Sequence, residues 1–240
     1  MKRPVRIGFL VPPGNPTCEP EMFRLAPPGV TVHFTRMVAH GEAGSHKGQE
    51  ERNRTQIAHL EENVALLTMV KPAVIVMAHT ASSYTLGQQG EKDLIAKMVK
   101  ATGIPFLTAF GSVLTALDRL GVKRVALGAP YAYDSMMKSK AYLELHGLQV
   151  PGYGVLENVV NIYDETPERA YELGRKVDTS EAQAIFLTGV GMPTIEILEK
   201  LERDAGKPAI SSASAMMWDA LRTAGVKDAI TGYGKLLSLP

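Results

Sequence analysis

The stretches AVIVMAHTASSY (residues 73–84) and AQAIFLTGVGMPT (residues 182–194) decide the fold of this chain. In each, a short apolar run breaks off into a turn of small and hydroxyl-bearing residues. Continuous apolar runs of this length are typical of parallel strands that are covered on both faces. An α/β sheet presents its chemistry at the carboxyl ends of such strands. The two stretches therefore predict a site between two related lobes, with His79 and Gly189 in the two turns.

Short apolar runs alternate with amphipathic segments along the rest of the chain. The expected strands span residues 5–11, 30–36, 73–78, 105–108, 124–128, 149–155, 182–187 and 209–211. The expected helices span residues 49–70, 90–102, 110–120, 134–146, 167–177, 192–205 and 213–224. This alternation predicts βαβ units and parallel sheets.

An internal repeat indicates a duplication. Residues 104–124 and 207–228 share one order: a proline, a strand, a small polar turn, a helix and a Gly-Val-Lys sequence. The expected fold is α/β, with two pseudo-symmetric lobes, each a mainly parallel sheet flanked by helices, and the active site in the cleft between them. We expect residues 1–110 to form the first α/β lobe and residues 111–215 the second. Residues 216–240 are expected to be a C-terminal helix and tail that pack back on the first lobe.

Composition excludes several classes of function. The 240 residues are 45% hydrophobic, which is typical of soluble globular proteins that bury a core. The net charge of +1, without a basic block, argues against nucleic acid or an anionic membrane as a partner. A single cysteine, Cys18, excludes a disulfide framework and a cysteine-rich zinc site. Without a signal-peptide core or an 18-residue apolar span, the expected location is cytoplasmic.

Two further turns carry polar groups. After the first strand comes VPPGNPTCEPE (residues 11–21), in which Asn15 offers an amide and Thr17 is expected to cap a helix. The turn APYAYD (residues 129–134) is its counterpart in the second lobe, where the Tyr131 hydroxyl could donate to a carboxylate. Each turn alone is also compatible with ordinary packing.

Taken together, five motifs resemble one family in the right order: VPPGNPTCEPE, AHTASSY, APYAYD, LTGVGMPT and SSASAMMWDA, from residues 11, 78, 129, 187 and 211. They resemble the aspartate/glutamate racemase superfamily, and within it arylmalonate decarboxylase and maleate cis-trans isomerase. The resemblance covers nearly the whole chain. It implies a two-lobed fold that needs no metal and no organic cofactor, and leaves monomer and homodimer both open.

The resemblance also implies a substrate and its site. Members hold a small carboxylic acid in a cage of backbone N–H and hydroxyl donors and react at the carbon next to the carboxylate. Preorganised donors of this kind stabilise an enediolate-like anion. The residues carried over as catalytic are His79, Thr80 and Tyr131. The residues carried over as substrate-binding are Gly14, Asn15, Ala81, Ser82, Tyr84, Asn158, Gly189, Val190 and Gly191.

The chain departs from the family at its two usual thiols. Racemases and isomerases of the superfamily carry a cysteine on each lobe, and arylmalonate decarboxylases keep only the second. This chain has His79 at the first position and Gly189 at the second. Two-thiol racemisation is thereby excluded, and thiolate addition to maleate is strongly disfavoured. Gly189 is expected to leave space for a larger substituent or a water.

Three roles are open for His79: an acid/base with a pKa near neutrality, a group that binds a substrate carboxylate, or a histidine packed at a turn. A second acid or base could be Cys18, His40, His46 or water. Cys18 also fits a small buried apolar residue. Residues 50–52 (Glu-Glu-Arg) are expected on an exposed helix face.

The expected function is a cofactor-independent, decarboxylase-like lyase that acts on a small carboxylic or dicarboxylic acid through a carboxylate-stabilised carbanion. Residues 80–82 would hold the oxyanion, and His79 would deliver or remove the proton. The alternatives are a maleate-type cis-trans isomerase that shuttles protons without cysteine, and a non-catalytic carboxylate-binding protein.

Overall fold

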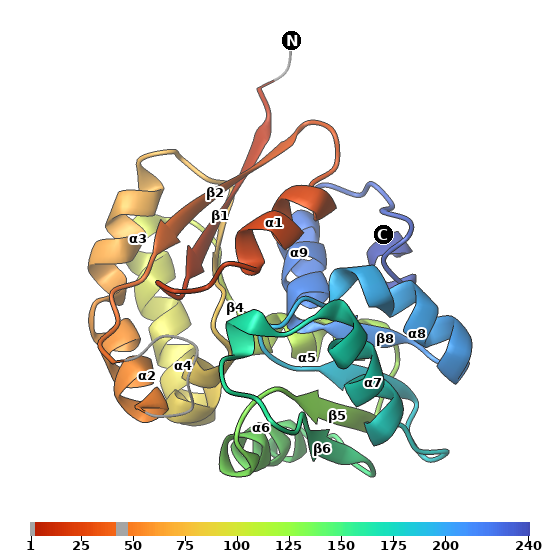
Figure 1. The fold of residues 1–240 in the computed structure, drawn as a ribbon. Helices are drawn as coiled ribbons and strands as arrows, with labels where there is room; N and C mark the ends of the chain where they lie inside the picture. The colour runs from red at the N-terminus through yellow and green to blue at the C-terminus, as the bar shows by residue number, and fades with distance from the viewer. Residues whose placement is uncertain (1–2, 42–47) are drawn as a thin grey trace.

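A computed structural model describes residues 3–41 and 48–240 (Figure 1). The first sheet is parallel and has the strand order β2-β1-β3-β4. Its strands are β1 (Val5–Val11), β2 (Val30–Arg36), β3 (Val74–Met77) and β4 (Phe106–Thr108). The side chains of β3 are fully buried, as expected for an apolar strand covered on both faces.

The second sheet repeats the first. It is parallel with the order β6-β5-β7-β8, so each strand has a counterpart in the first sheet at the same place. Its strands are β5 (Val125–Ala129), β6 (Tyr153–Val155), β7 (Ala184–Leu187) and β8 (Ala209–Ser211). Ile7 pairs with Val74 in one lobe, and Val125 pairs with Ala184 in the other. The predicted α/β fold of two related parallel sheets is confirmed.

Helices flank both sheets. Those of the first half are α1 (Cys18–Leu25), α2 (Gln49–Ala58), α3 (Leu60–Thr68), α4 (Thr80–Thr102) and α5 (Ala109–Arg119). Those of the second half are α6 (Tyr133–Leu145), α7 (Pro167–Val177), α8 (Leu198–Ala205), α9 (Ser212–Thr223) and α10 (Lys235–Ser238). Two short 3₁₀ helices are η1 (Ile162–Asp164) and η2 (Ile195–Ile197).

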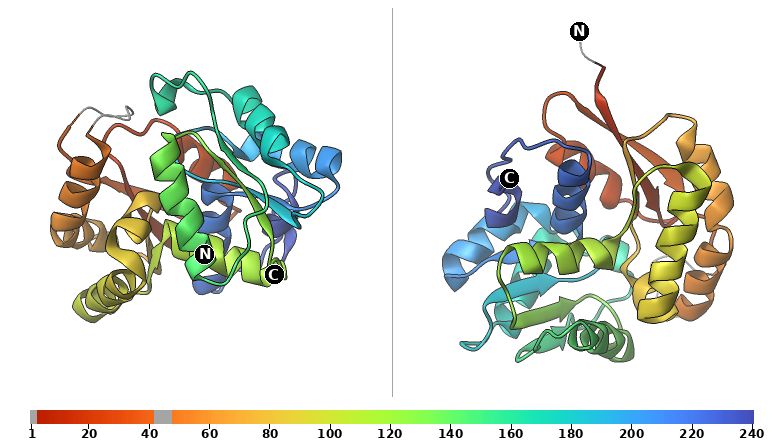
Figure 2. Two further views of the ribbon diagram at one scale, coloured as in Figure 1. Left: turned by 90° about the horizontal axis from the view of Figure 1, so that it is seen from below. Right: turned by 180° about the vertical axis from the view of Figure 1, so that it is seen from behind.

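Helices α5 and α9 join the two lobes. They pack against each other, and the right-hand view of Figure 2 shows both at the junction of the sheets. Phe110 of α5 contacts Phe186 of β7 in the second sheet, with ring centroids 6.2 Å apart. Helix α9 follows the second sheet but contacts α1 and β3 of the first. Helix α5 therefore contacts the second sheet, and helix α9 contacts the first. As a result, one apolar core extends through both lobes.

Several element boundaries differ from the prediction. The expected helix 49–70 breaks at His59, whose backbone (φ −98°, ψ 11°) leaves the helical region. Helix α4 begins at Thr80, with Ala78 and His79 between it and β3, whereas the prediction placed its start at residue 90. The helix bends at Gly87 (φ 71°, ψ 172°). The expected helix 192–205 becomes helical only at η2 and α8, because the glycines and Pro193 form a turn. Within the described ranges, no helix is long and apolar enough to span a membrane.

Candidate active site

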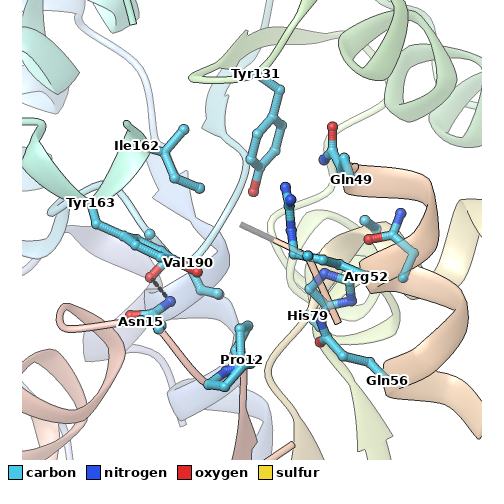
Figure 3. A pocket seen from close by; sticks show the side chains of 16 residues that line it. Pro12, Asn15, Gln49, Arg52, Gln56, His79, Tyr131, Ile162, Tyr163 and Val190 are labelled. Carbon is cyan, nitrogen blue, oxygen red and sulfur yellow. Dashed lines mark hydrogen bonds between the residues drawn. The ribbon is translucent and has the colours of Figure 1, made fainter. Parts of the chain in front are cut away.

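A cavity lies where the strands of both lobes end. The turns after β1, β3, β5 and β7 all contribute to its wall, as the parallel topology requires. Helix α2 closes one side and η1 the other (Figure 3). Seven of the predicted site residues line the cavity, and they are Gly14, Asn15, His79, Ala81, Tyr131, Val190 and Gly191.

The other predicted residues lie behind this wall or away from it. Thr80 and Ser82 are buried and support Tyr131 and His79. Gly189 lies behind Tyr131. The Tyr84 hydroxyl is buried without a hydrogen-bond partner among the described residues, and Tyr84 does not line the cavity. Asn158 is exposed in a left-handed turn (φ 57°) and does not line the cavity.

His79 is the residue that immediately precedes α4. Its Nδ1 lies 2.8 Å from Ser82 Oγ, so Nε2 is the ring nitrogen left for the cavity. Burial, and secondly the positive charge of Arg52, lower the pKa of His79 from about 6.5 to about 4. The imidazole is therefore neutral near pH 7.

Tyr131 faces His79 from the second lobe, and its hydroxyl points into the cavity (Figure 3). Burial raises the pKa of Tyr131 to about 12, and the neighbouring Thr80 side chain opposes this rise only in part. A Cβ on Gly189 would overlap this hydroxyl and lie 2.8 Å from Tyr131 Cζ. The expectation of open space beside Gly189 is thus wrong, because the tyrosine ring occupies it.

Asn15 ties the two lobes together at the base of the cavity. Its Oδ1 accepts from Thr17 N (2.8 Å) and Cys18 N (2.9 Å), and its Nδ2 donates to Val190 O (2.9 Å). Asn15 therefore caps α1, whereas the expected cap, Thr17, instead donates through Oγ1 to Gly191 O (2.8 Å). The first-lobe turn thereby holds the second-lobe turn by two hydrogen bonds.

Two candidates for a second acid or base, Cys18 and His40, do not line the cavity. Cys18 is fully buried, and burial raises the pKa of its thiol, so it is no thiolate at neutral pH. His40 is exposed, with its backbone N–H donating to Thr55 Oγ1 (3.1 Å) and its ring 6.2 Å from that of His59. His46 lies outside the described residues.

We did not predict from the sequence that one face of helix α2 lines the cavity. Gln49, Arg52, Asn53 and Gln56 all line the cavity at the spacing i, i+3, i+4, i+7 of a single helix face. Arg52, expected on an exposed face, is half-buried there. The i, i+3, i+4, i+7 spacing of these residues can be read from the sequence. It did not indicate a buried face, because buried helix faces are usually apolar, whereas this one carries amide side chains.

Ile162 and Tyr163 of η1, also missed, form the opposite wall. Asn161 positions them by accepting from Tyr163 N (2.9 Å). Burial raises the pKa of Tyr163, so this wall is aromatic and uncharged. The cavity thus has one cationic and amide-rich side and one aromatic side.

This arrangement suits a small anion next to a proton carrier. Arg52 supplies a positive charge, the Tyr131 hydroxyl and backbone turns supply donors, and neutral His79 can exchange a proton. In residues 3–41 and 48–240, no group of three or more His, Cys, Asp or Glu side chains is arranged to hold a metal ion.

The two parallel lobes and their shared cleft define an Asp/Glu racemase-like α/β protein. The chain belongs to the arylmalonate decarboxylase family, whose model matches residues 7–237. Maleate isomerase of Nocardia farcinica is 31% identical in an alignment that covers 97% of this chain and 95% of the relative. Arylmalonate decarboxylase of Bordetella bronchiseptica is 32% identical in an alignment that covers 68% of this chain and 70% of the relative.

Solved structures of a maleate isomerase and an arylmalonate decarboxylase are also similar to this chain. The Nocardia farcinica maleate cis-trans isomerase, in a serine-for-cysteine mutant with a covalently bound succinylcysteine intermediate, has a TM-score of 0.87 at 28% identity and covers 98% of each chain. A glycine-to-cysteine mutant of arylmalonate decarboxylase in a sulfate-associated form has a TM-score of 0.82 at 26% identity, over 97% of this chain and 99% of that one. The relatives are decarboxylases and isomerases.

Proposed function

We propose that this protein is a cofactor-independent lyase that decarboxylates a small dicarboxylic acid, with His79 as the proton carrier. The observation that carries the proposal is the pair of His79 and Tyr131, which face one cavity from the two lobes beside the Arg52 guanidinium. No thiol lines this cavity, since the chain has one cysteine and it is buried elsewhere.

Arg52 and Tyr131 support the binding of the substrate. A guanidinium pairs well with a carboxylate, and a tyrosine that stays protonated donates to the second one. The Tyr131 ring is buried and packs against Gly189, which limits the positions that its hydroxyl can take. A donor positioned in this way stabilises the charge that builds up on the enediolate when carbon dioxide leaves.

Decarboxylation consumes one proton, and His79 is the residue that delivers it. When the C–C bond to the departing carboxylate breaks, its electron pair stays on the remaining carbon as an enediolate. That carbon then takes one proton, so each turnover consumes one. A bound dianion favours the charged form of a neighbouring imidazole and so raises the pKa of His79, which can then carry that proton through Nε2.

A cysteine adduct of the kind that the isomerase structure carries finds no support here. Addition through sulfur needs an accessible thiolate, and Cys18 is fully buried with a raised pKa. An isomerase of this chain would have to move protons between His79 and Tyr131 instead. That alternative is an outcome of the test below.

The test is a mass-spectrometric screen of malonates, maleate and related acids with wild-type protein and the His79→Ala variant. Release of carbon dioxide by the wild type, lost in the variant while ligand binding persists, supports the lyase. Isomerised maleate without a change of mass contradicts it and favours the isomerase. Binding of acids without any turnover contradicts both enzymes and favours a binding protein.

A further inference from the structure

Two amide oxygens in the cavity wall lack a donor. Asn53 and Gln56, on α2, are 5% and 2% exposed. Neither Asn53 Oδ1 nor Gln56 Oε1 has a hydrogen-bond partner within the described part of the chain. Buried acceptors are almost always paired, because an unpaired one has lost its water without compensation. Both residues line the same cavity as His79 and Arg52.

The neighbouring groups limit where these oxygens can find a donor. Asn53 Nδ2 donates to Thr85 Oγ1 (3.3 Å) on α4, while no described donor reaches Asn53 Oδ1. Gln49, on the same face of α2, differs, because its Oε1 accepts from Ser135 Oγ (2.8 Å). One amide of this face is therefore satisfied by protein, whereas the two deeper ones are not.

Arg52 limits which kind of chemical group can donate a hydrogen bond to these two amide oxygens. Its positive charge, on the same helix face, repels an ammonium group and attracts a carboxylate. The donor that fits is neutral, and a hydroxyl group provides an O–H without adding charge.

We propose that the substrate is a hydroxylated carboxylic acid, whose hydroxyl donates to Gln56 Oε1 or Asn53 Oδ1 while a carboxylate pairs with Arg52. The inference rests on the proposed carboxylate chemistry of this cavity and extends it to the substrate's second functional group. A site built to pair with a hydroxyl discriminates strongly against analogues that lack one, since its acceptors then stay unpaired.

The experiment compares malonate, hydroxymalonate and aminomalonate by calorimetric titration of the wild-type protein, with the titrations repeated in His79→Ala to remove heat from turnover. We expect hydroxymalonate to bind at least about 10-fold more tightly than malonate, the equivalent of one good hydrogen bond. Aminomalonate should bind no better than malonate, because Arg52 opposes its ammonium group.

Two variants assign the preference to the amides. Gln56→Met and Asn53→Leu should each reduce the preference for hydroxymalonate over malonate, and the double variant should bring it to within about 2-fold. The control is Gln89→Met, an exposed α4 glutamine that donates to Asp93 Oδ1 (2.8 Å), which should keep the full preference. Gln56→Met should fold well, because it removes an oxygen without a partner.

Equal binding of malonate and hydroxymalonate would overturn the inference and leave the proposed lyase intact. A preference that persists in the double variant would also overturn it. Preferential binding of hydroxymalonate without release of carbon dioxide from any acid would support this inference and contradict the lyase. Failure of all three acids to bind would contradict both.

Discussion

The hydroxyl of Tyr131 occupies the space that a side chain at Gly189 would need. Gly189 has a left-handed backbone (φ 97°), and a Cβ there would lie 2.8 Å from Tyr131 Cζ. Its N–H donates to Ser212 Oγ (3.1 Å), which fixes the turn. The second lobe therefore presents a phenol to the cavity beside a glycine that cannot take a side chain without moving it.

Gly189→Ala should destabilise the protein because it combines backbone strain with this overlap. Gly29→Ala is a matched control, since Gly29 has a similar φ (86°) and nothing near its Cβ position. We expect about 1 kcal/mol for Gly29→Ala and about 2–4 kcal/mol for Gly189→Ala in urea unfolding. Equal losses would show that Tyr131 does not constrain this position.

Tyr131→Phe should keep the fold and lose catalysis. The ring stays, while the hydroxyl that donates to the substrate disappears, so kcat/KM should fall by about 10²–10³-fold. Tyr133→Phe, at an exposed tyrosine two residues away, should leave steady-state kinetics unchanged. A Tyr131→Phe enzyme with wild-type kcat/KM would remove the hydroxyl from the proposed mechanism.

Arg52→Met should raise the pKa of His79, because it removes one of the two causes that depress it. Burial is the larger cause and remains, so the new value should lie above about 4 and below 6.5. NMR titration of the imidazole measures this shift. Arg54→Met is the control, an exposed arginine of the same helix that pairs with Glu50 (2.6 Å), and should leave the His79 titration unchanged. An unchanged pKa in Arg52→Met would refute the assigned electrostatic coupling.

The fold could be predicted from the sequence, and part of the site could not. Topology alone places the residues in the turns after the strands, such as His79 and Tyr131, since parallel strands end at one edge. Arg52 and Gln56 reach the cavity only because α2 turns a polar face inward, which tertiary packing decides. The overlap of Tyr131 with Gly189 is a distance between lobes, so no local pattern encodes it.

Glu21 should make the stability of the protein pH-dependent. Its Oε1 accepts from Thr194 N (2.6 Å) and Ile195 N (3.0 Å) of the other lobe, and burial raises its pKa from 4.5 to about 7. The folded state then binds more protons than the unfolded state between these values, so stability falls as pH rises through this window and levels off above it.

Urea unfolding from pH 4.5 to 8 checks this effect against Glu21→Gln, which cannot titrate. The wild type should lose about 1–3 kcal/mol more than the variant across the window. Parallel curves for the two proteins would mean that Glu21 titrates normally in the folded state.

The role of His79 as proton donor is tested most directly by the pH dependence of kcat/KM for release of carbon dioxide from a fully ionised malonate. Because the pKa of His79 in the free protein is about 4, the donor form becomes tenfold scarcer with each pH unit near neutrality. The account predicts that log kcat/KM falls with a slope of about −1 between roughly pH 6.5 and 8.5. A flat profile over that range would contradict it.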